Sequence, residues 1–96
     1  VSHPVWYKSA MKPKKLLQKI NQQNYQNIDF ADFVSLVEAV GFRKLRQRGS
    51  HRVYIHPKIE KILNLQPSSN GDAKPYQVRQ FQDLATMYNL NTEGAK

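Results

Sequence analysis

The sequence contains no cysteine. This absence excludes a disulfide framework, a thiolate nucleophile and a zinc site built on thiolates. Long hydrophobic runs are missing as well, since no stretch reaches the roughly eighteen apolar residues of a membrane-spanning helix. The first ten residues, VSHPVWYKSA, lack the apolar centre and the small-residue cleavage site of a secretory signal. We therefore predict a chain without a membrane segment and expect a cytoplasmic location.

Acidic residues are also scarce. Seven Asp and Glu stand against fifteen Lys and Arg, which gives a formal net charge of +8 at pH 7. Residues 1–20 contain five lysines and no acidic residue, and residues 43–58 contain six Lys or Arg and again no acidic residue. Such an excess favours nucleic acid, an acidic protein or an anionic membrane as partner. The second cluster lies within a segment that has strong folding signals, so it is not a charged tail.

The residues that are present suffice for one small domain. With 96 residues, of which 40% are hydrophobic, the chain can bury a single modest core. We predict a basic N-terminal extension over residues 1–27, a folded domain over residues 28–90 and a flexible tail over residues 91–96. Within the extension, a short helix is expected to begin near Pro13 and to pack weakly. Residues 1–10 are either native or part of a tag.

Two segments have the periodicity of helices with one buried face. In residues 27–42, NIDFADFVSLVEAVGF, apolar side chains recur at three- and four-residue spacing. Asp29 is the expected N-cap of this helix, and Gly41 is its expected C-terminal stop with positive φ. The second helix is predicted to begin at Pro75 and to end at Asn89. The residues predicted to face the core are Phe30, Phe33, Val34, Val37, Val40, Val78, Phe81, Leu84, Ala85 and Tyr88.

Between these helices the hydrophobic period shifts towards two, which is typical of strands. FRKLRQ and HRVYIH, residues 42–47 and 51–56, are predicted to form a hairpin around the two-residue turn Gly49–Ser50. In the second strand we predict that Val53 and Ile55 face the core. The opposite face is predicted to carry Arg52, Tyr54 and His56. A third strand, KILNLQ, is expected to add Leu63 and Leu65 to the core face.

The order of these elements defines the fold class. It is α+β, a two-layer α-β-β-β-α arrangement in which two helices cover one face of a three-stranded antiparallel sheet. The other face of the sheet is expected to stay free and to be mostly polar or basic. No repeat, phosphate-binding glycine loop or paired set of metal ligands occurs in the sequence.

Residues 34–57, VSLVEAVGFRKLRQRGSHRVYIHP, followed by the closing helix, resemble the HicA toxins of bacterial HicA–HicB toxin–antitoxin systems. The resemblance covers about residues 30–90. It rests on a helix that ends in Gly41–Phe42, a basic strand, and the triplet Gly49–Ser50–His51 that opens the next strand. The chain departs from the family pattern after the third strand, where LQPSSNGDAKPYQVRQF replaces a stretch with proline and histidine, and in its basic N-terminal extension.

The resemblance implies a fold similar to double-stranded-RNA-binding domains. It also implies the activity of an mRNA interferase, a small basic endoribonuclease, and a HicB-like antitoxin as protein partner. Within the triplet, it assigns RNA cleavage to His51, with Gly49 and Ser50 supporting the motif. We expect RNA as the second partner, and neither a metal nor a small-molecule cofactor nor a membrane.

A histidine beside arginines suits cleavage of RNA without a metal. Imidazole has an ordinary pKa that lets it exchange a proton near neutrality, and RNA contains its own nucleophile, the 2′-hydroxyl. His51 is therefore the predicted general base. The residues predicted to bind the phosphates are Arg46, Arg48, Arg52 and Lys74. The proton donor to the leaving group stays open between Lys74, Tyr76 and His56.

Structural explanations exist for the same residues. His51 can be a half-exposed polar side chain at the start of a strand, and the basic cluster can be a solvated strand face. His56, followed by Pro57, is more often structural, whereas Tyr54 either stacks on a base or packs across the strands. Three hypotheses follow. The chain is an endoribonuclease toxin held inactive by an antitoxin, a non-catalytic RNA-binding module, or a protein-interaction domain whose charge aids solubility.

Overall fold

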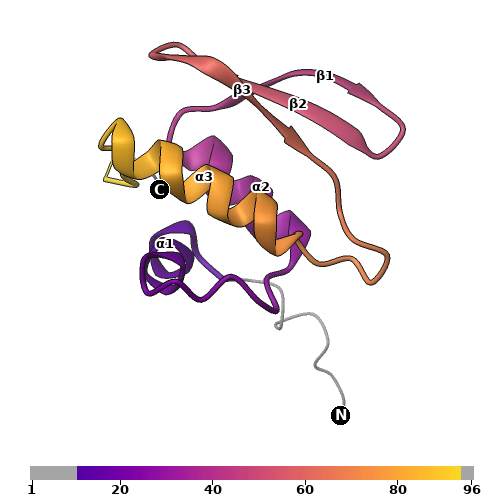
Figure 1. Cartoon of the computed structure of the whole chain (residues 1–96), viewed down its shortest axis with the longest axis horizontal. Coiled ribbons are helices and arrows are strands. Elements are labelled where there is room, and N and C mark those ends of the chain that lie inside the picture. The colour runs from indigo at the N-terminus through magenta and orange to yellow at the C-terminus, as the bar shows by residue number, and fades with distance from the viewer. Residues whose placement is uncertain (1–10, 94–96) are drawn as a thin grey trace.

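The computed structural model describes residues 11–93, so the expectations for residues 1–10 and for residues 94–96 of the predicted tail lie outside it. The elements are α1 (Pro13–Asn21), α2 (Phe30–Ala39), β1 (Arg43–Arg48), β2 (His51–His56), β3 (Ile59–Leu65) and α3 (Pro75–Met87). The strands form one antiparallel sheet in the order β1-β2-β3. α2 and α3 lie side by side on one face of it (Figure 1). The α+β class and the predicted α-β-β-β-α order are confirmed.

α2 begins and ends at the residues that the sequence indicated. The Asp29 carboxylate accepts a hydrogen bond from the backbone N–H of Asp32 at 3.2 Å, which is the geometry of an N-cap. At the other end, Gly41 has a φ of +113°, a conformation that L-residues rarely adopt. The chain therefore reverses directly into β1, and Phe42 is buried beneath the sheet.

The cap makes a measurable contribution to stability. We expect Asp29→Ala to lower the free energy of unfolding by about 1 kcal/mol, because Asp32 loses the acceptor for its N–H. Asp29→Asn is the matched control. It keeps an acceptor oxygen and removes a negative charge beside Asp32, whose pKa is raised by burial and then by the Asp29 carboxylate. Urea unfolding at neutral pH should show Asp29→Asn within a few tenths of a kcal/mol of the wild type; equal losses in both variants would contradict the cap.

Aromatic rings join α2, α3 and the residue that precedes β1. Phe33 of α2 meets Phe81 of α3 edge-to-face at 5.6 Å between ring centroids, and Phe42 lies 6.2 Å from Phe81. Such offset contacts are favourable beyond the area they bury. Nine of the ten helix residues predicted to face the core are buried. Tyr88 is the exception at 40% exposed, because α3 ends at Met87 and the chain leaves the core face there.

The prediction for the two faces of β2 is wrong. Tyr54 is 1% exposed and faces the helices, whereas Val53 and Ile55 are only half-buried on the outer face. The register with β3 explains the reversal, since Tyr54 pairs with Leu63, and paired residues share a face. Leu63 belongs to the core, as predicted, and it brings Tyr54 to the same side. Alternation within one strand defines two faces, but only its partner decides which is buried.

The expectation that the α1 segment packs weakly is wrong as well. Leu16 and Ile20 are 1% and 0% exposed and belong to the same core cluster as the residues beneath the sheet. α1 lies on the side of α2 and α3 that faces away from the sheet (Figure 1). Tyr25 donates a hydrogen bond to the Gln82 side chain, and the Gln82 amide donates to the Ile20 carbonyl at 3.0 Å. Leu16 and Ile20, one helical turn apart, with Leu17 partly buried beside them, attach α1 to the core.

No helix within residues 11–93 is both long enough and apolar enough to cross a membrane.

Candidate functional site

The β1–β2 hairpin carries the motif Gly49–Ser50–His51. Gly49 has a φ of +58°, as a tight turn with glycine in the first position requires. Arg48 and His51 form the pair that closes the turn, and both side chains are exposed. The predicted two-residue turn is confirmed. His51 therefore lies in the open at the very start of β2.

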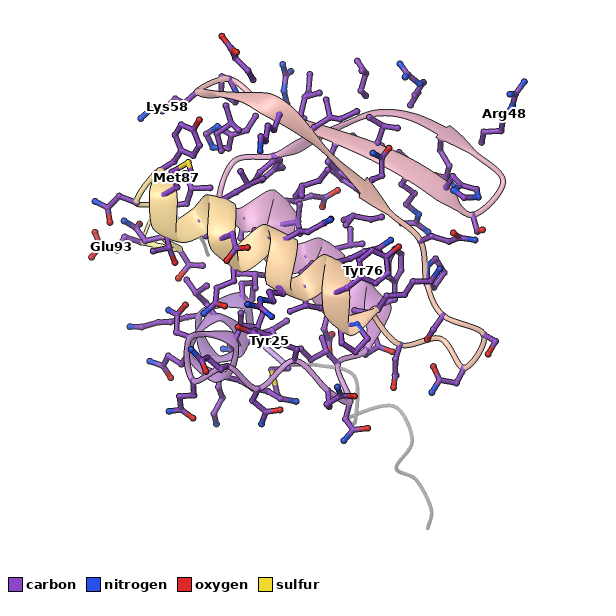
Figure 2. All side chains as sticks on the ribbon, viewed as in Figure 1. Tyr25, Arg48, Lys58, Tyr76, Met87 and Glu93 are labelled. Atoms are coloured by element: carbon purple, nitrogen blue, oxygen red, sulfur yellow. The ribbon has the colours of Figure 1, made fainter. Side chains whose placement is uncertain are left out.

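Three arginines share the outer face of the sheet with His51. Paired residues of antiparallel strands lie on the same face, and the pairs are Arg48 with His51, Arg46 with Val53 and Arg43 with Ile55. A bulge makes this possible. The register shifts between Lys44 and Arg46, so Leu45 is an extra residue that reverses the alternation and turns Arg46 and Arg48 to the same face as Arg43. Figure 2 shows Arg48 pointing away from the helices.

Arg52 does not belong to this group. It shares a face with Tyr54, as predicted, but that face meets the helices, so the prediction that Arg52 lies opposite the core is wrong. Its guanidinium lies over the Phe30 ring at 5.1 Å from the centroid, on the face that meets the helices. Its Nε is buried and has no hydrogen-bond partner within the described part of the chain. Because Arg52 pairs with the buried Leu65, its direction is set by the core and not by the outer face. Arg52 and His51, although adjacent in sequence, lie on opposite faces of the sheet.

Lys74 lies close to the hairpin turn, although it comes from the start of α3. Its ammonium is 3.4 Å from Oε1 of Gln66, and the amide nitrogen of the same Gln66 donates to the Ser50 hydroxyl at 3.2 Å. The backbone N–H of Gln66 in turn donates to Oε1 of Gln77, at 3.1 Å. Gln66 and Gln77 were not predicted as site residues from the sequence. The signal that could have found Gln77 is its position four residues before Phe81, on the buried side of α3.

Of the proton donors left open by the sequence, His56 is excluded by its environment. It is 8% exposed, its Nε2 is 3.1 Å from the Val40 carbonyl, and its Nδ1 accepts a hydrogen bond from the Lys58 N–H at 3.1 Å. Since Nδ1 accepts, the tautomer that fits both bonds has its proton on Nε2, which donates to the Val40 carbonyl. The His56 and Phe42 rings meet in a T-shaped contact with their centroids 5.0 Å apart. His56 therefore has a structural role, joining the end of β2 to the end of α2.

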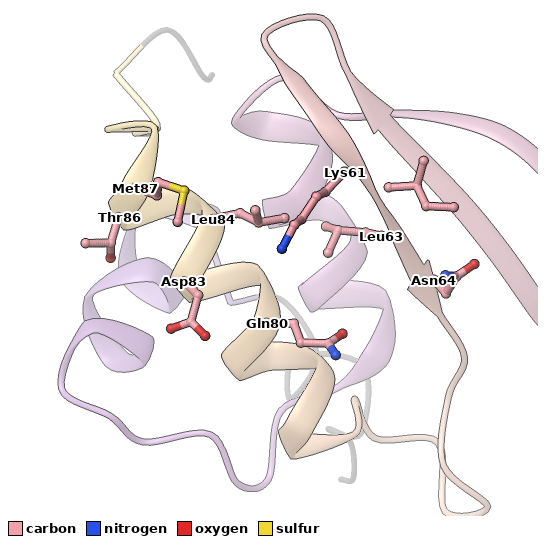
Figure 3. A pocket seen from close by; sticks show the side chains of 9 residues that line it. Lys61, Leu63, Asn64, Gln80, Asp83, Leu84, Thr86 and Met87 are labelled. Atoms are coloured by element: carbon pink, nitrogen blue, oxygen red, sulfur yellow. The ribbon is translucent and has the colours of Figure 1, made fainter.

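A groove of about 810 Å³ lies between β3 and α3 (Figure 3). Its lining includes Lys61, Asn64, Asp83 and Met87. None of the residues predicted for RNA binding or cleavage lines it. Across residues 11–93, no group of three or more His, Asp or Glu side chains is arranged to hold a metal ion. The candidate site is therefore the open face of the hairpin and not a pocket.

These features define a small basic α+β domain with a three-stranded sheet, two covering helices and an exposed histidine among arginines on the free face. This arrangement is consistent with a fold like that of double-stranded-RNA-binding domains. The family model described as the HicA toxin of bacterial toxin–antitoxin systems matches residues 30–86. The chain therefore belongs to the HicA toxin family. The matched segment runs from α2 almost to the end of α3, and α1 lies outside it. No curated protein and no solved structure matches the chain significantly.

Proposed function

We propose that the chain is an endoribonuclease toxin that cleaves mRNA without a metal, with His51 as the general base. One observation carries the proposal most directly. In a member of the HicA toxin family, an exposed imidazole stands on the same sheet face as Arg46 and Arg48. An extended RNA segment can reach this face because α2 and α3 cover the opposite face of the sheet (Figure 1).

The cleavage step uses the chemistry of RNA itself. His51 accepts the proton of a 2′-hydroxyl, the 2′-oxygen attacks the adjacent phosphorus, and the bond from phosphorus to the 5′-oxygen breaks. Negative charge grows on the phosphoryl oxygens during attack. Guanidinium groups are suited to this charge because they offer two parallel N–H donors. Arg46 and Arg48 fill this role, and the 5′-oxygen takes up a proton as it leaves.

Control of such an enzyme requires a partner, and membership of a toxin–antitoxin family implies an antitoxin. We propose a HicB-like protein that covers the hairpin. The sheet face offers Arg43, Arg46 and Arg48 without an acidic residue between positions 43 and 58. An acidic partner surface would complement these charges and accelerate association. Bound there, it would block access of RNA to His51.

One assay separates this function from the alternatives. Purified chain and its His51→Ala variant are incubated with a long RNA in EDTA. Cleavage by the wild type alone supports the nuclease. Equal binding without cleavage by either protein would identify a non-catalytic RNA-binding module, and no affinity even at low salt would leave a protein-interaction domain. In cells, expression without an antitoxin should arrest growth for the wild type but not for His51→Ala.

RNA binding itself should depend on the arginines of the outer face. Measured with a single-stranded RNA in the His51→Ala background, log affinity should fall linearly with log salt. Adding Arg48→Ala should reduce the slope by about 0.7, because one phosphate contact fewer releases fewer counterions. Arg79→Ala is the matched control, since Arg79 is an exposed arginine of α3 on the other side of the sheet. Equal changes in both variants would mean that the chain binds RNA through its net charge alone.

A further inference from the structure

The hairpin that carries His51 has few anchors of its own. Every residue from Arg43 to His51 is exposed. Figure 1 shows the turn between β1 and β2 projecting past the helices. Exposed hairpin tips without packed side chains open and move easily. Within β1 and the turn, one side chain secures the backbone, as Gln47 donates to the Gly49 carbonyl at 3.0 Å. A residue outside the hairpin must supply any further restraint.

Gln66 is in the right place for this. It follows β3 directly, and its side-chain nitrogen donates to the Ser50 hydroxyl at 3.2 Å. Its side-chain oxygen faces the Lys74 ammonium at 3.4 Å. One amide thereby joins the turn, the segment after β3 and the residue before α3. Ser50 is the residue next to His51.

Gln66 is itself held by a buried group. Gln77 is 5% exposed, and its Oε1 accepts the backbone N–H of Gln66 at 3.1 Å. The Gln77 amide nitrogen donates to the Tyr76 hydroxyl at 3.1 Å. A buried amide whose two ends are both bonded has one orientation that satisfies it. α3 therefore sets the position of Gln66, and Gln66 reaches the turn from a rigid base.

We propose that Gln66 is a positioning residue for cleavage, which acts on His51 by holding the Gly49–Ser50–His51 turn through the Ser50 hydroxyl. The inference rests on the proposed nuclease function. The contact of Gln66 with Lys74 also brings the ammonium of Lys74, a predicted phosphate-binding residue, to the same end of the hairpin. Gln66 does not touch the reacting atoms, so its removal changes how often His51 is correctly placed and not the chemistry of the step.

A double-mutant cycle tests this role. Gln66→Ala and Ser50→Ala should each lower the cleavage rate at saturating RNA about two- to ten-fold, the range expected for one net hydrogen bond. The double variant should lose no more than the larger single loss, because both changes break the same contact. Gln80→Ala is the control, because Gln80 is an exposed glutamine of α3 whose side chain makes no hydrogen bond within residues 11–93. Its effect should be negligible, and it should combine with Ser50→Ala additively.

Amide hydrogen exchange on the same proteins separates the two proposals. Exchange at residues 49–51 should rise in Gln66→Ala while the melting temperature stays close to that of the wild type. Losses that simply add, or exchange that does not change, would overturn the positioning role. If exchange rises but the wild-type chain cleaves no RNA, the turn is held as proposed and the nuclease function is the part that fails.

Discussion

A His51→Ala variant is expected to cleave RNA about 10²–10⁴-fold more slowly than the wild-type chain, the range that a general base contributes. The 2′-hydroxyl is a poor nucleophile until its proton is removed. The His51→Ala variant has no imidazole to accept that proton. The arginines remain, so RNA affinity should change little. The measurement is a single-turnover rate on a defined RNA with the enzyme in excess.

Two controls show that a loss of rate reflects lost proton transfer. Because His51 is exposed at the start of β2, its truncation should change the free energy of unfolding by no more than about 0.5 kcal/mol. Added imidazole should restore part of the rate to His51→Ala, since the vacated position is open to solvent, and should leave the wild-type rate unaffected. A variant as active as the wild type, with or without imidazole, would remove His51 from the mechanism.

Of the glycine-to-alanine substitutions within residues 11–93, Gly41→Ala is expected to destabilise the protein most. It should lower the free energy of unfolding by about 2–6 kcal/mol. Strain at a φ of +113° contributes about 1–3 kcal/mol. In addition, the new Cβ would stand 2.7 Å from Nε2 of His56. The buried ring cannot swing away without losing its hydrogen bond to Val40, a loss of about 1–3 kcal/mol. For a domain of this size, total stability is about 5–15 kcal/mol.

The clash and the strain can be measured separately. Gly71 also has a positive φ, of +89°, but nothing lies within 4 Å of a Cβ there, so Gly71→Ala reports the backbone term alone. In a His56→Ala background the steric term should vanish, and Gly41→Ala should then cost about as much as Gly71→Ala. Denaturant unfolding of these variants decides the matter. If Gly41→Ala remains as costly without the His56 ring, contact with that ring is not the cause.

These contacts place β2 between two anchors. At its C-terminal end, His56 binds the end of α2, and at its N-terminal end Ser50 binds Gln66. The two histidines of this strand therefore differ in environment. One is enclosed and bonded at both nitrogens, whereas the other is open to solvent. A strand held at both ends can present His51 at a defined place on the open face of the sheet.

Part of the site follows from local sequence alone. Glycine at position 49 requires a turn, aspartate at position 29 caps a helix, and proline at position 75 starts one, because each residue has a backbone or hydrogen-bonding property that acts within a few neighbours. The apolar spacing of α2 and α3 likewise determined their buried faces. These local properties were sufficient for the element order. His51 was proposed because the motif Gly49–Ser50–His51, at that place in the order, resembles the HicA toxins.

Only the tertiary structure decided which groups share a face with His51. The bulge at Leu45 aligns Arg43 with Arg46 and Arg48, and the pairing of Arg52 with Leu65 turns that arginine away. The tertiary structure also showed that Gln66 reaches Ser50 and that α1 packs on the core. The physical reason is common to all of them. Register, bulges and hydrogen bonds between distant segments depend on partners far along the chain, and periodicity within one segment contains no information about those partners.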